Sequence, residues 1–306
     1  MSDGTPRLSV VAPLHNEAGT VEELVARLVA VLGARGESFE IVLVDDGSTD
    51  GTPALLRTLR TTTPALRVFS LSRKFGQAAA LCCGIFESRG AVVVTMDGDL
   101  QNPPEEIPRL LDALEPGVDL VTGRRAVRHE TPWRWLGSRA VHWVARTLVG
   151  GDIQDFGGQF KAYRREVVDA TRTVWAPGKP FFALAVSLGF RVVEIPVRHD
   201  PRKVGSSRYD LLSLIRLNVE LITSFTTVPL ALLGVLSLLA GGAGGAGVAW
   251  CWWTGATSGL AVGLSLLLLG LGGVFFAAAA LGVYLARLYR TVAGGATGWV
   301  LRRSDE

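Results

Sequence analysis

A long stretch without charged residues limits how this chain can fold. From Leu221 to Ala286 there is no Asp, Glu, Lys, Arg or His, a run of 66 residues. One membrane-spanning helix needs about 20 predominantly apolar residues, so the run has room for two spans and a turn. We therefore predict transmembrane helices at residues 227–253 and 260–286.

Charges on either side of this run predict its orientation. Arg208 and Arg216 precede the first predicted span, and Arg287 and Arg290 follow the second. Because basic residues beside membrane spans favour the cytoplasmic side, we expect both termini in the cytoplasm and the turn at residues 254–259 outside.

The segment before the first span is predicted to be an interfacial helix, over residues 206–226. Leu212, Ile215 and Val219 recur with helical spacing there, with polar side chains between them. Such a helix directly before a span is typical of one that lies on the bilayer surface, although the pattern also suits a surface helix packed on a soluble domain. Residues 287–306 are predicted to be a cytoplasmic tail.

The first 205 residues are predicted to form one domain in which strands and helices alternate. Apolar strands alternating with helices indicate an α/β domain with a mostly parallel sheet and helices on both faces. Thr20 and Glu23 have the spacing of a capping box at the start of the first helix. The predicted strands cover residues 8–14, 40–44, 67–71, 91–96 and 119–122.

Acidic turns follow two of these strands. Asp45 and Asp46 come after the second strand, and Asp97 and Asp99 after the fourth. Two carboxylates two residues apart can hold a divalent cation together with a phosphate-bearing ligand, and Gln101 adds a neutral oxygen. An isolated Asp-x-Asp pair is usually a solvated turn, and the first acidic turn is equally well explained as a helix cap. Their shared place at the carboxyl ends of strands, where such sheets bind ligands, favours a binding site.

Composition excludes several classes of protein. The net charge of +3 over 306 residues lacks the basic excess of a general nucleic-acid binder. The four histidines accompany no Ser or Cys nucleophile motif, so a hydrolase triad has no support. Three cysteines without a Cys-x-x-Cys pair support neither a disulfide framework nor a zinc site, and a reducing location is the simple interpretation.

Six strings together resemble family 2 glycosyltransferases, and more narrowly the polyprenyl-phosphate glycosyltransferases, the group of dolichol-phosphate mannose synthase and the bacterial undecaprenyl-phosphate glucosyltransferases. The most specific is DGDLQNPPE at residues 97–105. The others are VVAPLHNE at 10–17, VDDGSTD at 44–50, LSRKFG at 71–76, DFGGQF at 155–160 and RKVGSSRY at 202–209. The resemblance covers nearly the whole chain and implies a catalytic domain of the Rossmann-like GT-A type.

The resemblance also implies roles for individual residues. Asp97, Asp99 and Gln101 would hold Mg²⁺ or Mn²⁺ and the donor diphosphate, and Arg125, Arg139 and Arg208 would bind the acceptor phosphate. Of these, Asp97, Asp99, Arg125 and Arg139 are the expected catalytic residues. The nucleotide-sugar pocket would be lined by Pro13, His15, Glu17, Asp46 and Asp97.

The implied reaction is metal-dependent, inverting transfer of a hexose from a UDP- or GDP-sugar to a polyprenyl phosphate at the cytoplasmic membrane face. The expected partners are therefore the nucleotide sugar, the lipid phosphate and the membrane, without nucleic acid. The glycine-rich stretch at residues 241–247 can support helix association, which leaves a homo-oligomer open.

Two other functions fit parts of the sequence. One is glycosyl transfer to a different membrane lipid, and the other is a catalytically dead, membrane-anchored scaffold. The acidic and basic residues expected in the site are all present, which weighs against the scaffold. A processive polysaccharide synthase is disfavoured because the chain has no Gln-x-x-Arg-Trp string.

Overall fold

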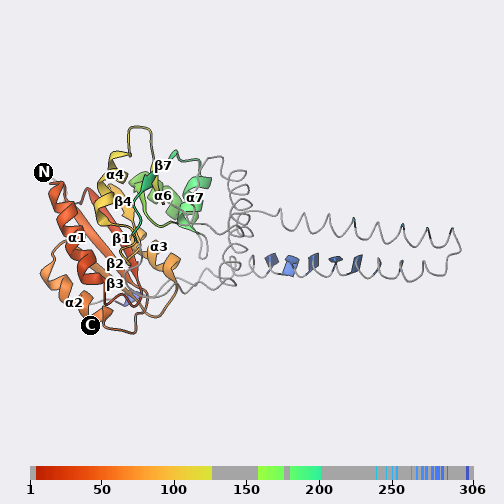
Figure 1. The fold of residues 1–306 in the computed structure, drawn as a ribbon, viewed down its shortest axis with the longest axis horizontal. Coiled ribbons are helices and arrows are strands. Elements are labelled where there is room, and N and C mark those ends of the chain that lie inside the picture. The colour runs from red at the N-terminus through yellow and green to blue at the C-terminus, as the bar shows by residue number, and fades with distance from the viewer. Residues whose placement is uncertain are drawn as a thin grey trace. The chain divides into compact units, whose positions relative to one another are not determined.

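The computed structural model describes residues 5–125, 158–175, 180–200 and 301–302, and scattered positions between 239 and 288. The chain divides into two compact units, residues 1–208 with 297–306, and residues 209–296. Figure 1 shows the first unit as a sheet with α1 on one side and α3 on the other.

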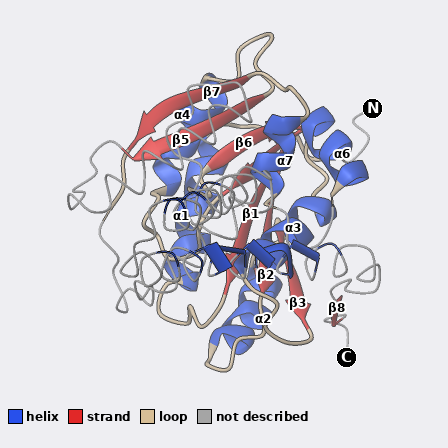
Figure 2. Cartoon of the chain, turned by 90° about the vertical axis from the view of Figure 1, so that its right-hand side faces the viewer, coloured by secondary structure: helices blue, strands red, loops and turns tan. Residues whose placement is uncertain are grey.

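A mixed sheet is the centre of the first unit. Its described strands follow the order β7-β5-β6-β4-β1-β2-β3-β8, and Figure 2 shows the sheet between β7 at one edge and β8 at the other. The four strands around its middle run parallel to one another: β1 (Leu8–Leu14), β2 (Phe39–Asp45), β3 (Leu66–Leu71) and β4 (Val92–Thr95).

The remaining strands extend the sheet at both ends. The strand β6 (Lys161–Arg164) runs antiparallel to both β4 and β5 (Leu120–Arg125). The strand β7 (Val192–Val197) is parallel to β5, and β8 (Leu301–Arg302) is antiparallel to β3. The five predicted strands are therefore confirmed, whereas β6, β7 and β8 were not predicted because they are short or carry charged residues and a proline.

Helices cover both faces of the sheet, as predicted. On one face α1 (Val21–Ala34), α2 (Thr52–Thr62) and α4 (Ile107–Asp112), which follows the 3₁₀ turn η1 (Pro104–Glu106), pack against one hydrophobic cluster. On the other face α3 (Gln77–Glu87), α6 (Arg165–Val174) and α7 (Phe181–Ser187) pack against a second cluster.

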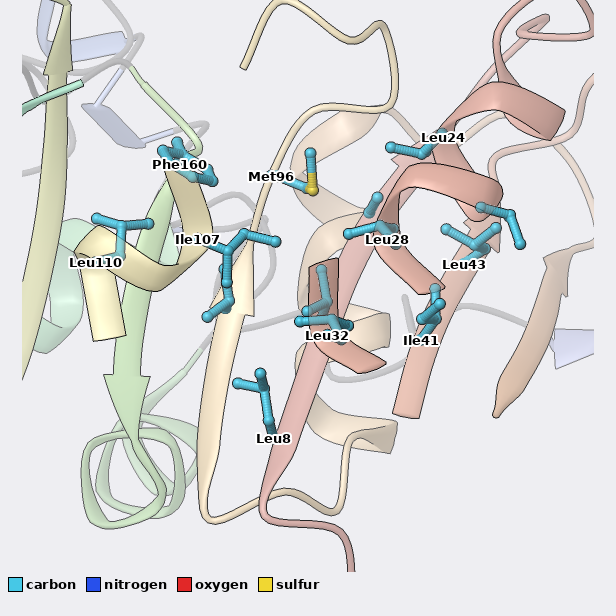
Figure 3. Packing of buried hydrophobic residues seen from close by; sticks show 14 of the residues in the cluster. Leu8, Leu24, Leu28, Leu32, Ile41, Leu43, Met96, Ile107, Leu110 and Phe160 are labelled. Atoms are coloured by element: carbon cyan, nitrogen blue, oxygen red, sulfur yellow. The ribbon is translucent and has the colours of Figure 1, made fainter. Parts of the chain in front are cut away.

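Successive side chains of β1 alternate between the two hydrophobic clusters. Val10 and Ala12 belong to the first cluster and Val11 to the second, as expected because successive side chains of a strand point to opposite faces. Figure 3 shows the leucines of α1 packed against this sheet face, at Leu24, Leu28 and Leu32. Each such side chain contributes about 1.5–3 kcal/mol when fully buried.

The predicted membrane segments fall mostly outside the described residues. This holds for residues 206–226, for most positions of 227–253 and 260–286, and for most of the tail at 287–306. The positions that are described within the two predicted spans are helical. Over the described positions, the structure contains no helix with the length and apolar character needed to cross a bilayer.

Strand register brings the carboxyl ends of the parallel strands to one edge of the sheet. Leu14 is aligned with Asp45, and Asp45 with Ser70. Thr95 is aligned with Val11, and the backbone N–H of Met96 donates to the carbonyl of Val11 over 3.0 Å. The loops after β1, β2, β3 and β4 therefore start side by side.

Asp46, in the loop after β2, holds the loop after β3 in place. Its buried carboxylate accepts hydrogen bonds from the backbone N–H groups of Phe75 (2.6 Å) and Gly76 (2.9 Å). Gly47 has φ +64°, and a Cβ there would lie 2.6 Å from the backbone nitrogen of Lys74, so only glycine lets the two loops approach this closely.

We expect Asp46→Asn to loosen this connection, because an amide oxygen replaces only one of the two charged acceptors. The free energy of unfolding should fall by about 1–3 kcal/mol, and hydrogen–deuterium exchange of residues 72–77 should rise. The matched control is Asp50→Asn. Asp50 lies in the more exposed part of the same turn, and its carboxylate also accepts hydrogen bonds from two backbone N–H groups. Equal exchange at residues 72–77 in wild type and Asp46→Asn would contradict the role of Asp46.

Candidate active site

Loops at the carboxyl edge of the sheet bring most of the described candidate residues together. The turn after β1 carries His15 and Glu17, which are half-buried, next to the buried Pro13 at the end of the strand. His15 Nδ1 lies 2.9 Å from the carbonyl oxygen of Asp46, to which it donates a hydrogen bond. The predicted nucleotide-binding residues of β1 and β2 are therefore neighbours, and their contact with a nucleotide stays a prediction.

Side-chain hydrogen bonds connect the turns after β1 and β2. Asn16, in the left-handed region with φ 59°, accepts a hydrogen bond from Thr49 N through its Oδ1 (2.8 Å). Its own backbone N–H donates to Ser48 Oγ over 2.9 Å, and Glu17 N donates to Thr52 Oγ1 over 2.9 Å. This edge of the site is thus ordered by the protein itself.

Thr20 joins the same turn to the loop after β4. The predicted capping box with Glu23 is wrong, since no side-chain hydrogen bond caps α1. The Thr20 hydroxyl instead lies 2.9 Å from Glu17 Oε2 and 3.3 Å from the carbonyl oxygen of Gly98. Glu23 pairs with Arg27 on the exposed face of the helix.

The acidic turn after β4 has a defined shape. Leu100 has φ 61°, which costs a non-glycine residue about 1–2 kcal/mol. Its side chain is 1% exposed, and its burial contributes about 1.5–3 kcal/mol, enough to offset that cost. The turn is closed by the backbone N–H of Gln101, which donates to Asp99 Oδ1 over 3.1 Å. A Cβ at Gly98 would overlap Leu14 Cδ2 and lie 3.1 Å from the carbonyl oxygen of Pro13, so a larger residue would have to displace the buried Leu14 side chain.

Two amide side chains that the sequence did not single out hold Asp97. Gln77 Nε2 donates to Asp97 Oδ1 over 2.5 Å, and Asn102 Nδ2 lies 3.4 Å from Asp97 Oδ2. Gln77 begins α3, directly after the string at residues 71–76, and Asn102 lies inside the string at 97–105. Their place in or directly beside these two strings is the only signal from which the sequence could have identified them.

The donor set of this turn suits a hard divalent cation. Asp97 and Asp99 supply carboxylates and Gln101 an amide oxygen, and all three are half-buried. Over the described residues no group of three or more His, Cys, Asp or Glu side chains could hold a metal. Mg²⁺ and Mn²⁺ are commonly held by one or two carboxylates together with phosphate and water, so the residues present fit a cation that is shared with a diphosphate.

The described cysteines do not supply a nucleophile. Cys82 and Cys83 are buried on α3, and burial raises the pKa of each thiol to about 12. Both are therefore neutral at pH 7, whereas the thiolate is the reactive form.

The predicted acceptor residues are only partly placed. Arg125 ends β5, where its backbone is aligned with Val197 of β7, but its side chain lies outside the described residues. Arg139 and Arg208 lie wholly outside them. Their assignment to the acceptor phosphate thus remains a prediction.

Sequence comparison identifies relatives over nearly the whole chain. Two proteins named undecaprenyl-phosphate 4-deoxy-4-formamido-L-arabinose transferase are similar to it. The one from Edwardsiella ictaluri (strain 93-146) is 35% identical over 302 residues, covering 93% of this chain and 90% of its own. The one from Pseudomonas syringae pv. syringae (strain B728a) is 36% identical over 297 residues, covering 93% and 87%.

Comparison of folds agrees with the sheet topology. Glucosyl-3-phosphoglycerate synthase from Mycobacterium tuberculosis in complex with UDP has a TM-score of 0.51 and 23% identity, over 72% of this chain and 79% of its own. This likeness concerns the fold, and it confirms the mixed α/β sheet of GT-A type that the resemblance implied.

The family profile described as glycosyl transferase family 2 matches residues 9–172. This range runs from the second residue of β1 through β6 and contains both acidic turns. Together with relatives aligned over more than nine-tenths of the chain, it establishes that the protein belongs to glycosyltransferase family 2 and is a glycosyltransferase.

Proposed function

We propose that this glycosyltransferase moves a sugar from a nucleoside diphosphate to a polyprenyl phosphate, with inversion, at the cytoplasmic face of a membrane. The observation that carries the proposal is the Asp97–Asp99 turn, which β4 and β1 hold at the carboxyl edge of the sheet. The acceptor class is supported by the names of the relatives, which are undecaprenyl-phosphate transferases.

The donor side consists of residues that can bind a diphosphate and a cation. Asp97, Asp99 and Gln101 would hold Mg²⁺ or Mn²⁺, which neutralises negative charge that develops on the departing nucleoside diphosphate. Pro13, His15, Glu17 and Asp46 are proposed to form the nucleotide side of the pocket. Among them Asp46 has a supporting role in the structure, because both of its carboxylate oxygens already accept backbone hydrogen bonds.

The acceptor needs no general base. A phosphate monoester has a second pKa of about 6, so its oxygens are largely ionised at pH 7. One oxygen forms the bond to the anomeric carbon while the bond from that carbon to the donor diphosphate breaks, and its electron pair leaves with the diphosphate. A single displacement of this kind inverts the anomeric configuration. Arg125, Arg139 and Arg208 are proposed to hold the acceptor phosphate against repulsion by the donor, a task for which bidentate guanidinium groups are well suited.

The transferred sugar is the least constrained part of the proposal. The sequence-based expectation is a hexose, whereas the relatives are named for 4-deoxy-4-formamido-L-arabinose. The test therefore includes hexoses and 4-deoxy-4-formamido-L-arabinose as transferred sugars. Each is supplied as its UDP or GDP derivative, where that nucleotide sugar exists.

The test uses the purified full-length protein with a panel of these sugar nucleotides and a short polyprenyl phosphate. We expect one donor to give a lipid-phosphate-linked sugar of inverted configuration. Diacylglycerol, ceramide and no acceptor are the comparison arms. Transfer to diacylglycerol or ceramide alone would establish a glycosyltransferase that acts on a different membrane lipid. No transfer to any acceptor would favour a catalytically dead, membrane-anchored scaffold. Retention at the anomeric carbon would contradict the single displacement.

A membrane anchor in residues 227–286 is part of the proposal. Of the large apolar side chains that are exposed among the described residues, most lie between Leu239 and Leu288, including Trp250 at 70% and Leu285 at 56%. Burial of such side chains in lipid would remove this apolar surface from water. The pairing of Leu301–Arg302 with β3 supports a C-terminus on the same side as the sheet.

Cysteine labelling tests this topology. In a background with the native cysteines replaced, Ser258→Cys should react with an impermeant thiol reagent from outside intact cells. Arg57→Cys on the exposed side of α2 is the matched cytoplasmic position and should react only after lysis. The reverse pattern would invert the topology.

Metal dependence is tested at Asp99. Asp99→Ala should lower transfer by more than about 100-fold and should weaken Mn²⁺ binding in the presence of nucleotide. Asp112→Ala, at the exposed end of α4, should leave both within twofold. Full turnover in EDTA, or by Asp99→Ala, would refute the metal assignment.

The acceptor assignment is tested at the arginines. Arg125→Ala or Arg139→Ala should slow transfer by about 30- to 1000-fold, which corresponds to about 2–4 kcal/mol. Donor affinity should change far less, because these side chains are assigned to the lipid phosphate, and Arg57→Ala serves as the surface control. If donor affinity collapses while lipid-phosphate affinity is unchanged, the assignment is wrong.

A further inference from the structure

The segment that follows β7 lies along the loop that carries the acidic turn. The backbone N–H of Asp200 donates to the carbonyl oxygen of Gln101 over 2.8 Å. Arg198 N lies 3.3 Å from Glu106 Oε2, and His199 Nδ1 lies 3.3 Å from Asn102 Oδ1. Hydrogen bonds from two backbone N–H groups, one to a side-chain carboxylate and one to a backbone carbonyl, thus flank the side-chain contact of His199 with Asn102.

Asn102 stands between His199 and the candidate site. It is 4% exposed, so the orientation of its amide is set by protein groups. Its Oδ1 faces His199, and its Nδ2 lies 3.4 Å from Asp97 Oδ2. Asparagine oxygen and nitrogen have nearly the same shape, and the hydrogen-bond partners decide which is which.

Donor and acceptor chemistry permits one arrangement of these three residues. A carboxylate that binds a cation is ionised and can only accept hydrogen bonds, so Asn102 must turn its Nδ2 towards Asp97. Its Oδ1, which can only accept, then faces His199. It follows that the His199 ring must carry a proton on Nδ1 to complete the chain.

We infer that His199 is a positioning residue of the active site, which fixes the amide of Asn102 and through it one oxygen of Asp97. Gln77 holds the other oxygen over 2.5 Å, so Asp97 is held from two sides. The inference rests on the proposed function, because Asp97 matters to the reaction only if the acidic turn binds the donor and its cation.

Two contacts connect His199 to Asp97: Asn102 with Asp97 at 3.4 Å and His199 with Asn102 at 3.3 Å. Both are longer than the usual length of about 2.9–3.0 Å for an N–H···O hydrogen bond. Asp97 is proposed to contact the donor and its cation, so its orientation matters when both are bound. The effect of His199 should therefore be measured with the cation and nucleotide present.

A simple packing role for His199 makes a different prediction. The ring is half-buried, and a leucine would fill a similar volume without donating a hydrogen bond. An asparagine is smaller, but it places an N–H donor close to the position of Nδ1. Packing therefore favours His199→Leu over His199→Asn, and positioning favours the reverse. The Asp200–Gln101 hydrogen bond belongs to the backbone and is available in both variants.

The experiment measures binding of MnCl₂ with UDP, and of MnCl₂ with GDP, to the full-length protein by calorimetry and by the electron paramagnetic resonance of free Mn²⁺. With the nucleotide that the wild type binds, His199→Leu should weaken binding by about 3- to 10-fold. His199→Asn should stay within twofold. The matched control is Arg198→Ala, whose side chain is 70% exposed and pairs with Asp200, and it should also stay within twofold.

Asn102→Leu extends the test along the chain. It should weaken binding at least as much as His199→Leu, and the double variant should be no weaker than Asn102→Leu, because both changes break the same connection. Because Asn102 is buried, thermal unfolding is measured to show whether Asn102→Leu is folded. If it is not, the comparison of His199→Leu with His199→Asn tests the inference without it. In ¹⁵N-histidine-labelled protein, the His199 signal, identified by its loss in His199→Asn, should show a protonated Nδ1.

Several results would overturn the inference. These are binding by His199→Leu within twofold of wild type, binding by His199→Asn as weak as by His199→Leu, additive effects in the double variant, or a neutral ring protonated only on Nε2. A wild type that binds Mn²⁺ with neither nucleotide would overturn the proposed function itself, which distinguishes the two failures.

Discussion

Parallel pairing of β1 with β2 and β4 is the interaction on which the candidate site depends. It aligns Leu14 with Asp45 and Val11 with Thr95, so turns that are far apart in sequence leave the sheet at one edge. Both faces of β1 are buried, and a slip of one residue would exchange its side chains between the two hydrophobic clusters. The register, and with it the position of both acidic turns, is therefore fixed by packing on two sides.

Hydrogen bonds from side chains to the backbone then give the loops their shape. A buried carboxylate is costly unless it is hydrogen-bonded, and Asp46 meets that condition with two backbone N–H groups from the loop after β3. Asp99 closes its own turn in the same way. Groups that the protein's own hydrogen bonds hold in place need little reorganisation when charge develops in the transition state, which is the condition for effective electrostatic stabilisation.

The proposed chemistry makes few demands beyond such positioning. The attacking oxygen belongs to the acceptor and is already ionised at pH 7, and the described cysteines are neutral thiols. In the proposed reaction the protein would bring two phosphate-bearing molecules together in spite of their repulsion. This task explains why carboxylates with their cation and a separate set of arginines would both be needed in one small region.

The local features of this protein follow from its sequence alone. Apolar runs bounded by turns gave the five strands of the first 125 residues, since burial on both sheet faces demands such runs. The six strings indicated the family, and the uncharged run from Leu221 to Ala286 predicted the membrane anchor. The hydrogen-bond partners of the polar side chains, by contrast, depend on the fold. The fold turns the Thr20 hydroxyl to Glu17 and Gly98 in place of a helix cap. The fold also makes Asp46 the hydrogen-bond acceptor that holds the loop after β3. It connects Gln77, Asn102 and His199 in one series of hydrogen bonds around Asp97. A polar side chain forms hydrogen bonds with the partners that the fold places within about 3 Å. The separation of two residues in the sequence does not predict that distance.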